Sequence, residues 1–191
     1  MICLTFFNNK KNDYFEPSAY ENVFKEKTNN MRTIFILYLM SNIHGIGAAD
    51  SLTGFELERY LGKWYEIARF DHRFERGMQK TTAEYTLMPD GSIKVTNSGY
   101  RDGVYHQSEG KAKTTNTPGL LKVSFFWFFY SDYRILALDN DYQYALIGSK
   151  SKDYLWILSR NPIIDEGSLE EILTIATGLG YDTEKLIWVE Q

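Results

Sequence analysis

From Trp64 onward the chain alternates apolar and polar residues over strand-length segments, and turn residues separate one segment from the next. Alternation with a period of two is typical of half-buried β-strands, because successive side chains of a strand point to opposite faces. Pro89-Asp90-Gly91 and Arg101-Asp102-Gly103 are typical hairpin turns. The pattern predicts eight consecutive strands, over residues 64–70, 79–87, 93–98, 104–114, 121–127, 133–138, 142–149 and 154–160.

Consecutive antiparallel strands leave no unpaired edge if their sheet closes on itself. We therefore predict an all-β fold, an eight-stranded antiparallel up-and-down β-barrel. A barrel of this size leaves room for one small ligand. A β-sandwich is the alternative architecture, but every connection here is short, whereas Greek-key sandwiches need at least one long return.

One late segment, residues 168–178, has the helical period instead, with Ser168 as the predicted N-cap. Its apolar face consists of Leu169, Ile172, Leu173 and Ala176. The outward positions of the last barrel strand, Leu155 and Ile157, are apolar, so we expect the C-terminal helix to pack there, outside the barrel. Residues 185–190 alternate again and predict a short ninth strand beside the first.

The start of the first strand predicts the closed end of the barrel. Gly62 opens the strand, and Trp64 takes its first inward position. A buried indole needs a partner for its face and for its N–H, and a cation suits the face. Consecutive strands alternate in direction, so the eighth strand ends at the same end of the barrel at which the first begins. Arg160, at the end of the eighth strand, should therefore lie near Trp64. We predict a structural closed end built from Gly62, Trp64 and Arg160; the alternative makes Trp64 an ordinary core aromatic and Arg160 a surface charge.

The phase of Trp64 also predicts which side chains face the interior. They are Glu66, Ala68, Phe70, Ala83, Tyr85, Leu87, Val95, Asn97, Leu121, Val123, Phe125, Tyr154 and Trp156. Apolar walls with a few polar groups are usual in a small-molecule site. A carboxylate inside a barrel must be paired or protonated, and Tyr85 or Arg160 could be the partner of Glu66. The alternative is a barrel filled by its own side chains.

The fifth predicted strand carries an aromatic run to the open end. Phe125 still points inward by phase, whereas Trp127, Phe128 and Phe129 lie at or beyond the rim and are predicted to form a portal. Exposed apolar patches mark contact sites. We expect this loop to fold over the mouth as a lid, to insert into a membrane surface, or to pair with the same loop in a homodimer.

The N-terminal part precedes the predicted domain, residues 50–191. Residues 31–49 have a positive start, a short apolar run and small residues at a cleavage point, which is typical of a signal peptide. The run is too short to span a bilayer, which needs about 20 residues. Residues 1–30 are a predicted non-native or disordered extension, with translation beginning at Met31. The alternative is one disordered tail over residues 1–49.

Composition and charge narrow the function further. The 21 basic and 25 acidic residues give a net charge of -4, and no basic block could neutralise a row of phosphates, which argues against a nucleic-acid partner. The one cysteine, Cys3, allows neither an intramolecular disulfide nor a cysteine metal cluster. The three histidines lack metal-site spacing. We expect no metal, no cofactor and no catalytic residues; a lipid-modifying enzyme is the weaker alternative.

Three groups of residues resemble the conserved regions of the lipocalin family. They are Gly62-Lys63-Trp64 before the first strand, residues 139–144 with two tyrosines at the sixth-to-seventh turn, and Arg160 at the end of the eighth strand. The similarity extends over residues 55–191 and is strongest to bacterial outer-membrane members. It implies binding, storage or transport of a fatty acid, a lysophospholipid or a similar amphiphile, in lipid handling of the cell envelope.

Two segments depart from the bacterial pattern. Bacterial members typically carry a lipobox cysteine after the signal, whereas Ala48-Ala49-Asp50 stands here. We expect export to the periplasm or the outer membrane without lipid attachment at this point, with secretion as the alternative. The aromatic loop of the family usually contains Gly and Pro, so Trp127 and Phe128 predict a bulkier mouth.

Overall fold

The structure is a computed structural model that describes residues 52–126 and 128–191. The predicted N-terminal extension over residues 1–30, the predicted signal peptide over residues 31–49 and the portal residue Trp127 lie outside the described residues. The division of the chain at residue 50 therefore stays a prediction.

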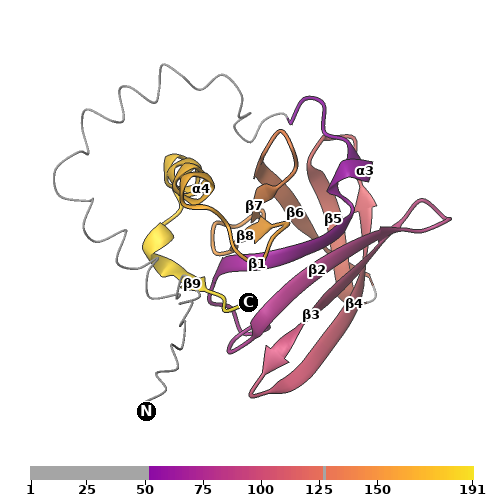
Figure 1. Ribbon diagram of the computed structural model, residues 1–191. Coiled ribbons are helices and arrows are strands. Elements are labelled where there is room, and N and C mark those ends of the chain that lie inside the picture. Colours follow the sequence, from indigo (N-terminus) through magenta and orange to yellow (C-terminus); the bar gives the residue numbers. More distant parts are fainter. Residues whose placement is uncertain (1–51, 127) are drawn as a thin grey trace, which may run out of the picture. The chain divides into compact units, whose positions relative to one another are not determined.

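The described chain consists mainly of antiparallel strands, with a short helix before them and a longer helix after them (Figure 1). The strands are β1 (Gly62–Phe70), β2 (Gln79–Leu87), β3 (Ile93–Arg101), β4 (Val104–Thr114), β5 (Leu120–Phe126), β6 (Phe129–Leu138), β7 (Tyr144–Gly148), β8 (Leu155–Ser159) and β9 (Leu186–Trp188). The helices are α3 (Leu57–Tyr60), α4 (Glu166–Gly178) and the 3-10 turn η1 (Thr183–Lys185). The predicted order of strands and helix is confirmed.

Hydrogen bonds between neighbouring strands close the sheet into a barrel. The strand order runs from β2 to β8, continues with β1, and β1 pairs again with β2. All of these pairs are antiparallel, so the predicted eight-stranded up-and-down barrel is confirmed. The predicted ninth strand, β9, pairs with the last part of β1, from Ala68 to Phe70. Among the described residues, no helix has the length and hydropathy needed to cross a bilayer.

Helix α4 lies against β7 on the outside of the barrel (Figure 1). Its buried side chains are those of the predicted apolar face. The outer side chains of β8, Leu155 and Ile157, are also fully buried. The predicted N-cap is wrong: the helix begins at Glu166, and the side chain of Asp165 accepts a hydrogen bond from the backbone N–H of Ser168. Asp and Ser cap helices about equally well, so the pattern did not distinguish them.

The aromatic run forms a tighter hairpin than the sequence predicts. Strand β6 begins at Phe129 rather than at Tyr133, and Phe129 pairs with Phe126 of β5. The side chains of Phe126 and Phe129 are 71% and 80% exposed. Because β5 runs toward the open end and β6 runs back, the hairpin tip lies at that end of the barrel. Phe126 and Phe129 therefore lie at the open end, as predicted for the aromatic run, while its portal role stays a prediction.

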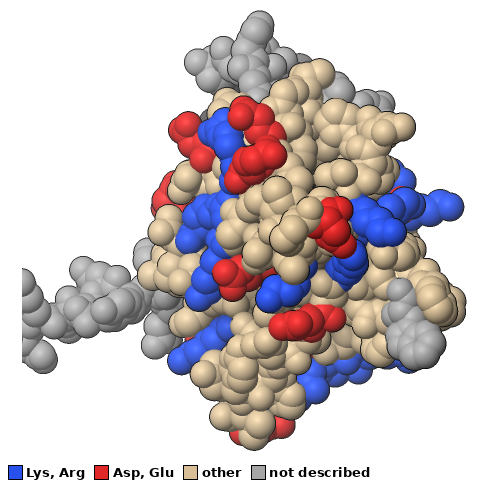
Figure 2. All heavy atoms as spheres, turned by 90° about the vertical axis from the view of Figure 1, so that its right-hand side faces the viewer, with Lys and Arg blue, Asp and Glu red and all other residues tan. Residues whose placement is uncertain are grey.

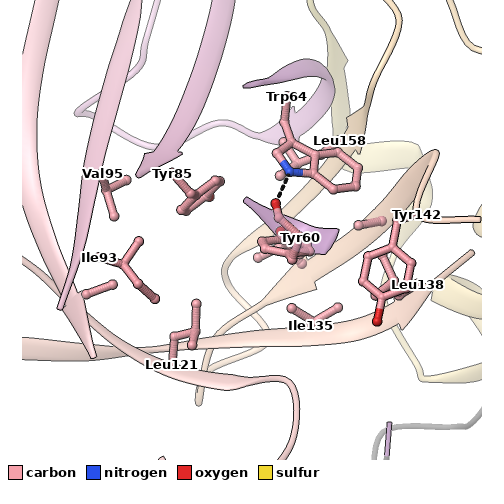
Figure 3. Packing of buried hydrophobic residues seen from close by; sticks show 13 residues of the cluster. Tyr60, Trp64, Tyr85, Ile93, Val95, Leu121, Ile135, Leu138, Tyr142 and Leu158 are labelled. Carbon is pink, nitrogen blue, oxygen red and sulfur yellow. Dashed lines mark hydrogen bonds between the residues drawn. The ribbon is translucent and has the colours of Figure 1, made fainter. Parts of the chain in front are cut away.

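Trp64 lies at the closed end, inside the cluster of buried hydrophobic residues shown in Figure 3. Its side chain is fully buried, and its Nε1–H donates a 2.8 Å hydrogen bond to the backbone carbonyl of Tyr60. The guanidinium carbon of Arg160 lies 3.8 Å from the centre of the indole ring. The predicted cation–π pair is confirmed, and Arg160 is not an isolated surface charge.

Arg160 also joins three backbone segments. Its guanidinium donates hydrogen bonds to the carbonyls of Arg59, Lys63 and Tyr142, at 2.7, 2.9 and 3.2 Å. One side chain therefore connects α3, the start of β1 and the turn before β7. Gly62 has a φ of +90°, which favours glycine, and a Cβ there would lie 3.5 Å from Nη1 of Arg160. The predicted role of Gly62 at the closed end is consistent with this geometry.

Three tyrosines, two buried and Tyr133 half-buried, lie inside the barrel next to Trp64. The hydroxyls of Tyr60 and Tyr133 lie 2.6 Å apart, and the hydroxyl of Tyr85 donates a 2.8 Å hydrogen bond to that of Tyr133. Burial raises the pKa of all three phenols, so they stay neutral. Aromatic side chains thus occupy the closed half of the barrel.

We predict that Trp64→Ala lowers the free energy of unfolding by about 3–5 kcal/mol, the usual range for a buried Trp or Phe. We expect Arg160→Ala to lower it by about 2–4 kcal/mol, because three carbonyls lose a donor and the indole loses its cation. Urea denaturation measures both. The control Arg76→Ala removes an exposed ion pair with Asp71 and should change stability by less than about 1 kcal/mol. Wild-type stability of Arg160→Ala would contradict this account of the closed end.

Candidate functional site

Most of the predicted interior side chains face one another inside the barrel. Cross-strand partners share one face of a sheet, and Trp64, Ala83 and Asn97 are partners on β1, β2 and β3. The buried interior cluster consists of Tyr60, Trp64, Tyr85, Ile93, Val95, Ala112, Leu121, Ile135, Leu138, Tyr142, Ala145, Ile147 and Leu158. Of the predicted set, Tyr85, Val95 and Leu121 belong to this cluster, and Ala83, Val123 and Trp156 pack against it.

Solvent reaches part of this interior. Ala83, Val123, Tyr133 and Trp156 pack against the buried cluster and still remain partly exposed. An inward side chain of a closed barrel keeps solvent exposure only where neighbouring side chains leave space. This partial exposure favours a barrel that keeps some space between its interior side chains over one filled entirely by them.

Ala68 and Phe70 are predicted interior residues that the structure places on the outside. The register between β1 and β8 shifts between Glu66 and Ala68, which is a β-bulge, and a bulge reverses the alternation of faces. Beyond it, Ala68 lies opposite Ile157, and the ring of Phe70 lies 6.2 Å from that of Tyr181, beyond α4 in the chain. The predicted cavity role of these two side chains is wrong.

The same bulge turns Arg69 into the barrel. Arg69 is 1% exposed and lies opposite Trp156 across the sheet. Its Nη1 donates a 2.6 Å hydrogen bond to Oε1 of Glu66. The partner of Glu66 is therefore Arg69, and the two partners considered from the sequence, Tyr85 and Arg160, are engaged elsewhere.

The loop between β1 and β2, residues 71–78, lies over this ion pair. Nη2 of Arg69 donates hydrogen bonds to the loop carbonyls of Glu75 and Met78, at 2.7 and 3.0 Å. From β3, the guanidinium of Arg101 donates to two other carbonyls of the same loop. One arginine inside the barrel and another on a neighbouring strand thus hold the loop at the mouth.

A further set of contacts joins this loop to β8. Nε1 of Trp156 donates a 3.0 Å hydrogen bond to Oε2 of Glu75, and Nε2 of His72 lies 3.1 Å from the same oxygen. The imidazole lies 5.7 Å from the ring of Tyr154 and 5.1 Å from that of Trp156. The predicted residues Tyr154 and Trp156 therefore meet two loop residues, His72 and Glu75, that the sequence analysis did not identify.

Burial determines the charges in this cluster. Removal from water, together with the charge of Glu75, raises the pKa of Glu66 to about 8, although Arg69 acts in the opposite direction. Burial also acts to raise the pKa of Glu75, but the adjacent His72 and Trp156 lower it overall. Near neutral pH, Glu75 is the more strongly ionised of the two carboxyl groups, and Glu66 takes up a proton readily.

Several buried polar side-chain atoms have no hydrogen-bond partner among the described residues. They include Nε of Arg69, Nδ1 of His72 and Oδ1 of Asn97. Buried polar groups are nearly always hydrogen-bonded in native proteins, to protein, water or ligand. These atoms are therefore candidates for contact with the polar part of a ligand.

Two other predicted interior residues lie near the barrel ends. Leu87 is 44% exposed at the closed end and does not belong to the interior cluster, so its predicted cavity role is wrong. Leu87 is the last residue of β2. The alternation of apolar and polar residues extends to it, but the packed interior ends before it. Phe125 lies over Gly110, where a Cβ would come within 2.8 Å of the Phe125 ring. Glycine at position 110 thus makes room for an aromatic ring near the mouth.

Residues 189–191 fill a gap in the barrel wall. Strands β1 and β2 pair only over residues 62–65 of β1, and the chain after β9 runs between them beyond that point. The side-chain amide of Gln191 donates hydrogen bonds to the carbonyls of Glu66 and Thr81, at 2.5 and 3.0 Å. A residue at the far end of the sequence therefore lies beside the buried Glu66, which no local pattern could predict.

A family model for the lipocalin-like domain matches residues 55–191. The chain belongs to the lipocalin family. Outer membrane lipoprotein Blc of Escherichia coli K12 is 52% identical to this lipocalin over 144 residues, which cover 73% of this chain and 81% of Blc. Blc of Vibrio cholerae serotype O1 is 44% identical over 170 residues, 84% of this chain and 99% of that protein.

The same fold occurs in solved structures with little sequence similarity. The major allergen Per a 4 from cockroaches superposes on this lipocalin with a TM-score of 0.61 and 21% identity, over 77% of this chain and 94% of that one. Such a likeness supports the barrel fold alone. Lipocalins are typically binding proteins.

The raised pKa of Glu66 predicts a pH-dependent stability. Because the pKa in the folded protein, about 8, lies above the ordinary value of 4.5, the folded state binds more protons between these values. The contribution of Glu66 to stability is thus fully present below about pH 4.5, falls as the pH rises, and is lost above about 8. We expect Glu66→Gln to gain stability relative to wild type between pH 5 and pH 9, measured by urea denaturation.

The control for this experiment is Glu84→Gln. Glu84 lies on β2 and is exposed, so the same chemical change there should shift stability equally at both pH values. A stability difference between wild type and Glu66→Gln that does not change with pH would contradict the raised pKa.

Proposed function

We propose that this lipocalin binds and stores or transports a small hydrophobic or amphipathic ligand, such as a fatty acid or a lysophospholipid, in the open half of its barrel. We further propose that it acts in lipid handling in the cell envelope after export to the periplasm or the outer membrane. Its similarity to proteins named as outer membrane lipoproteins supports this location. Ligand binding, rather than catalysis, is the proposed activity.

The observation that carries the proposal is an apolar interior that solvent reaches and that ends in a buried polar cluster. Ala83, Val123 and Trp156 supply apolar wall, and Glu66 and Arg69 supply the polar end. An acyl chain can replace water against the wall while its polar group meets the cluster. This division suits an amphiphile better than a uniformly apolar molecule.

The expected affinity follows from the length of an acyl chain. Burying about 15 methylenes at about 0.8 kcal/mol each provides about 12 kcal/mol. Association loses at least about 4 kcal/mol of translational and rotational freedom. About 8 kcal/mol remains, which corresponds to a micromolar dissociation constant.

We predict saturable binding of oleic acid and of oleoyl-lysophosphatidylcholine, at one molecule per chain and with dissociation constants of about 1 μM or lower. Tryptophan fluorescence is a suitable readout because Trp156 lines the interior. Val123→Phe should weaken binding about tenfold or more by filling the space, whereas Lys122→Phe, on the outward side of the same strand, should not. Equal effects of the two substitutions, or no saturation, would remove the proposal.

A second function is favoured by the exposed aromatic residues of the open end. Phe126 and Phe129 project from the β5–β6 hairpin, and Phe74 projects from the 71–78 loop, 60% exposed. Basic groups accompany the aromatic rings: Lys113 lies over Tyr130, with its Nζ 5.2 Å from the ring centre. We propose that these tips insert into a lipid surface, with cations at the level of the phosphates.

Charge is not concentrated on the visible face of the molecule. On the face in Figure 2, acidic and basic side chains are intermixed with uncharged ones, without a broad area of one sign. This arrangement agrees with the small net charge. A lipid surface would therefore be contacted chiefly through the aromatic tips.

We predict that Phe126→Ser combined with Phe129→Ser weakens association with phosphatidylglycerol-containing vesicles about tenfold or more, since each buried aromatic contributes about 1.5–3 kcal/mol. Vesicle co-sedimentation measures this effect. The matched control is Leu87→Ser with Met88→Ser, which removes exposed apolar residues at the closed end. If the hairpin variant keeps full vesicle association but changes from dimer to monomer, the hairpin is a subunit contact instead.

A further inference from the structure

The Nε–H group of Arg69 donates to no described residue. Nη1 donates to Glu66, and Nη2 donates to the carbonyls of Glu75 and Met78. Nε is buried and has no hydrogen-bond partner within residues 52–126 and 128–191. Arginine is always protonated and carries no acceptor, so this position requires a hydrogen-bond acceptor.

The neighbouring carboxyl groups already have partners, so they offer little attraction to a cationic ligand. Glu66 already accepts from Arg69, and Glu75 accepts from Trp156 and lies beside His72. A ligand cation entering this cluster would meet the Arg69 charge and carboxylates that are already paired. A ligand acid would meet an unpaired donor that carries a full positive charge, which gives a short, charge-assisted hydrogen bond.

We propose that the polar end of the ligand is an acid, a carboxylate or a phosphate monoester, which accepts a hydrogen bond from Nε of Arg69. This inference rests on the proposed function and adds the chemical class of the ligand head to it. The acid and Glu66 compete for the same guanidinium. Protonated Glu66 leaves the positive charge of Arg69 to the ligand, and ionised Glu66 repels the ligand.

The groups that face Glu66 come from each neighbouring segment. Arg69 is on its own strand, Glu75 is in the 71–78 loop, and Tyr85 faces it from β2. From β8 the partner across the sheet is the apolar Leu158. Arg69 is the cation nearest to Glu66 among these groups, so loss of the Glu66 proton directly lowers the positive charge available to an acidic ligand.

Two ligands that differ only in their acid test the proposal. We would measure the binding of 1-oleoyl-lysophosphatidic acid and of 1-oleoylglycerol to the full chain by tryptophan fluorescence, between pH 7 and pH 9.5. The second phosphate pKa is about 6, so the charge of the ligand changes little over this range. At pH 7 we expect the phosphate ligand to bind about tenfold tighter or more, the scale of a hydrogen bond to a charged group.

The pH dependence of binding, measured in wild type and in Glu66→Gln, distinguishes the contribution of Glu66 from that of other charges on the protein. We expect the advantage of the phosphate ligand to shrink at least about fivefold by pH 9.5 in wild type and to persist in Glu66→Gln, because that variant cannot ionise. The exposed control Glu84→Gln should behave as wild type. Oleic acid compared with oleyl alcohol repeats the test with a carboxylate and shows which acid is preferred.

The outcomes are distinguishable. Tight binding of both lipids with no preference at any pH, or equal pH dependence in wild type and Glu66→Gln, overturns the acidic head while the proposed lipid binding stands. Failure of both lipids to bind removes the proposed function itself. Arg69→Lys is a second variant, and if it folds, retention of the full preference for the acid would also contradict the assignment to Nε.

Discussion

One irregularity in β1, the bulge between Glu66 and Ala68, governs the open half of this lipocalin. Before the bulge, the strand points Trp64 and Glu66 inward; after it, Arg69 points inward. An arginine inside a barrel is stable only with partners, and it finds them in Glu66 and in two carbonyls of the loop at the mouth. The bulge therefore positions the polar cluster, the loop that lies over it and the outer surface on which the C-terminal strand pairs.

The closed end of the barrel contributes mainly to stability, and the open end is the proposed site of ligand binding. At the closed end, the indole N–H of Trp64, the guanidinium of Arg160 and the hydroxyls of three tyrosines all have partners, and Trp64 is fully buried. Toward the open end, interior side chains are partly exposed, and buried polar atoms such as Nε of Arg69 lack a hydrogen-bond partner in the described part of the chain. In an up-and-down barrel, each strand contributes side chains to both ends. The side chains at the closed end can therefore be tightly packed while the open end stays accessible.

Alternation and turn residues predicted the strands, and the count of traverses predicted that Arg160 meets Trp64, because up-and-down topology determines the level of each strand end. The prediction of inward-facing side chains was wrong beyond the bulge. Ile67 and Ala68 are both apolar, so the sequence does not show that the alternation of faces reverses there, and a charged residue such as Arg69 is expected on the outside. His72 could not be placed either, because the path of its loop depends on hydrogen bonds to distant side chains. A Glu and an Arg three residues apart within a buried strand are the signal that could have revealed the pair.

The central claim is that an acyl chain lies inside the open half of the barrel with its polar group near Arg69. A crystal structure of the chain with a fatty acid brominated at its terminal carbon tests it most directly, because anomalous scattering locates the bromine independently of phase bias. The account predicts a bromine peak within the barrel, between Tyr85 and Val123, and density for the acid beside Arg69. A bromine peak found only outside the barrel, at the β5–β6 hairpin or along α4, would contradict it.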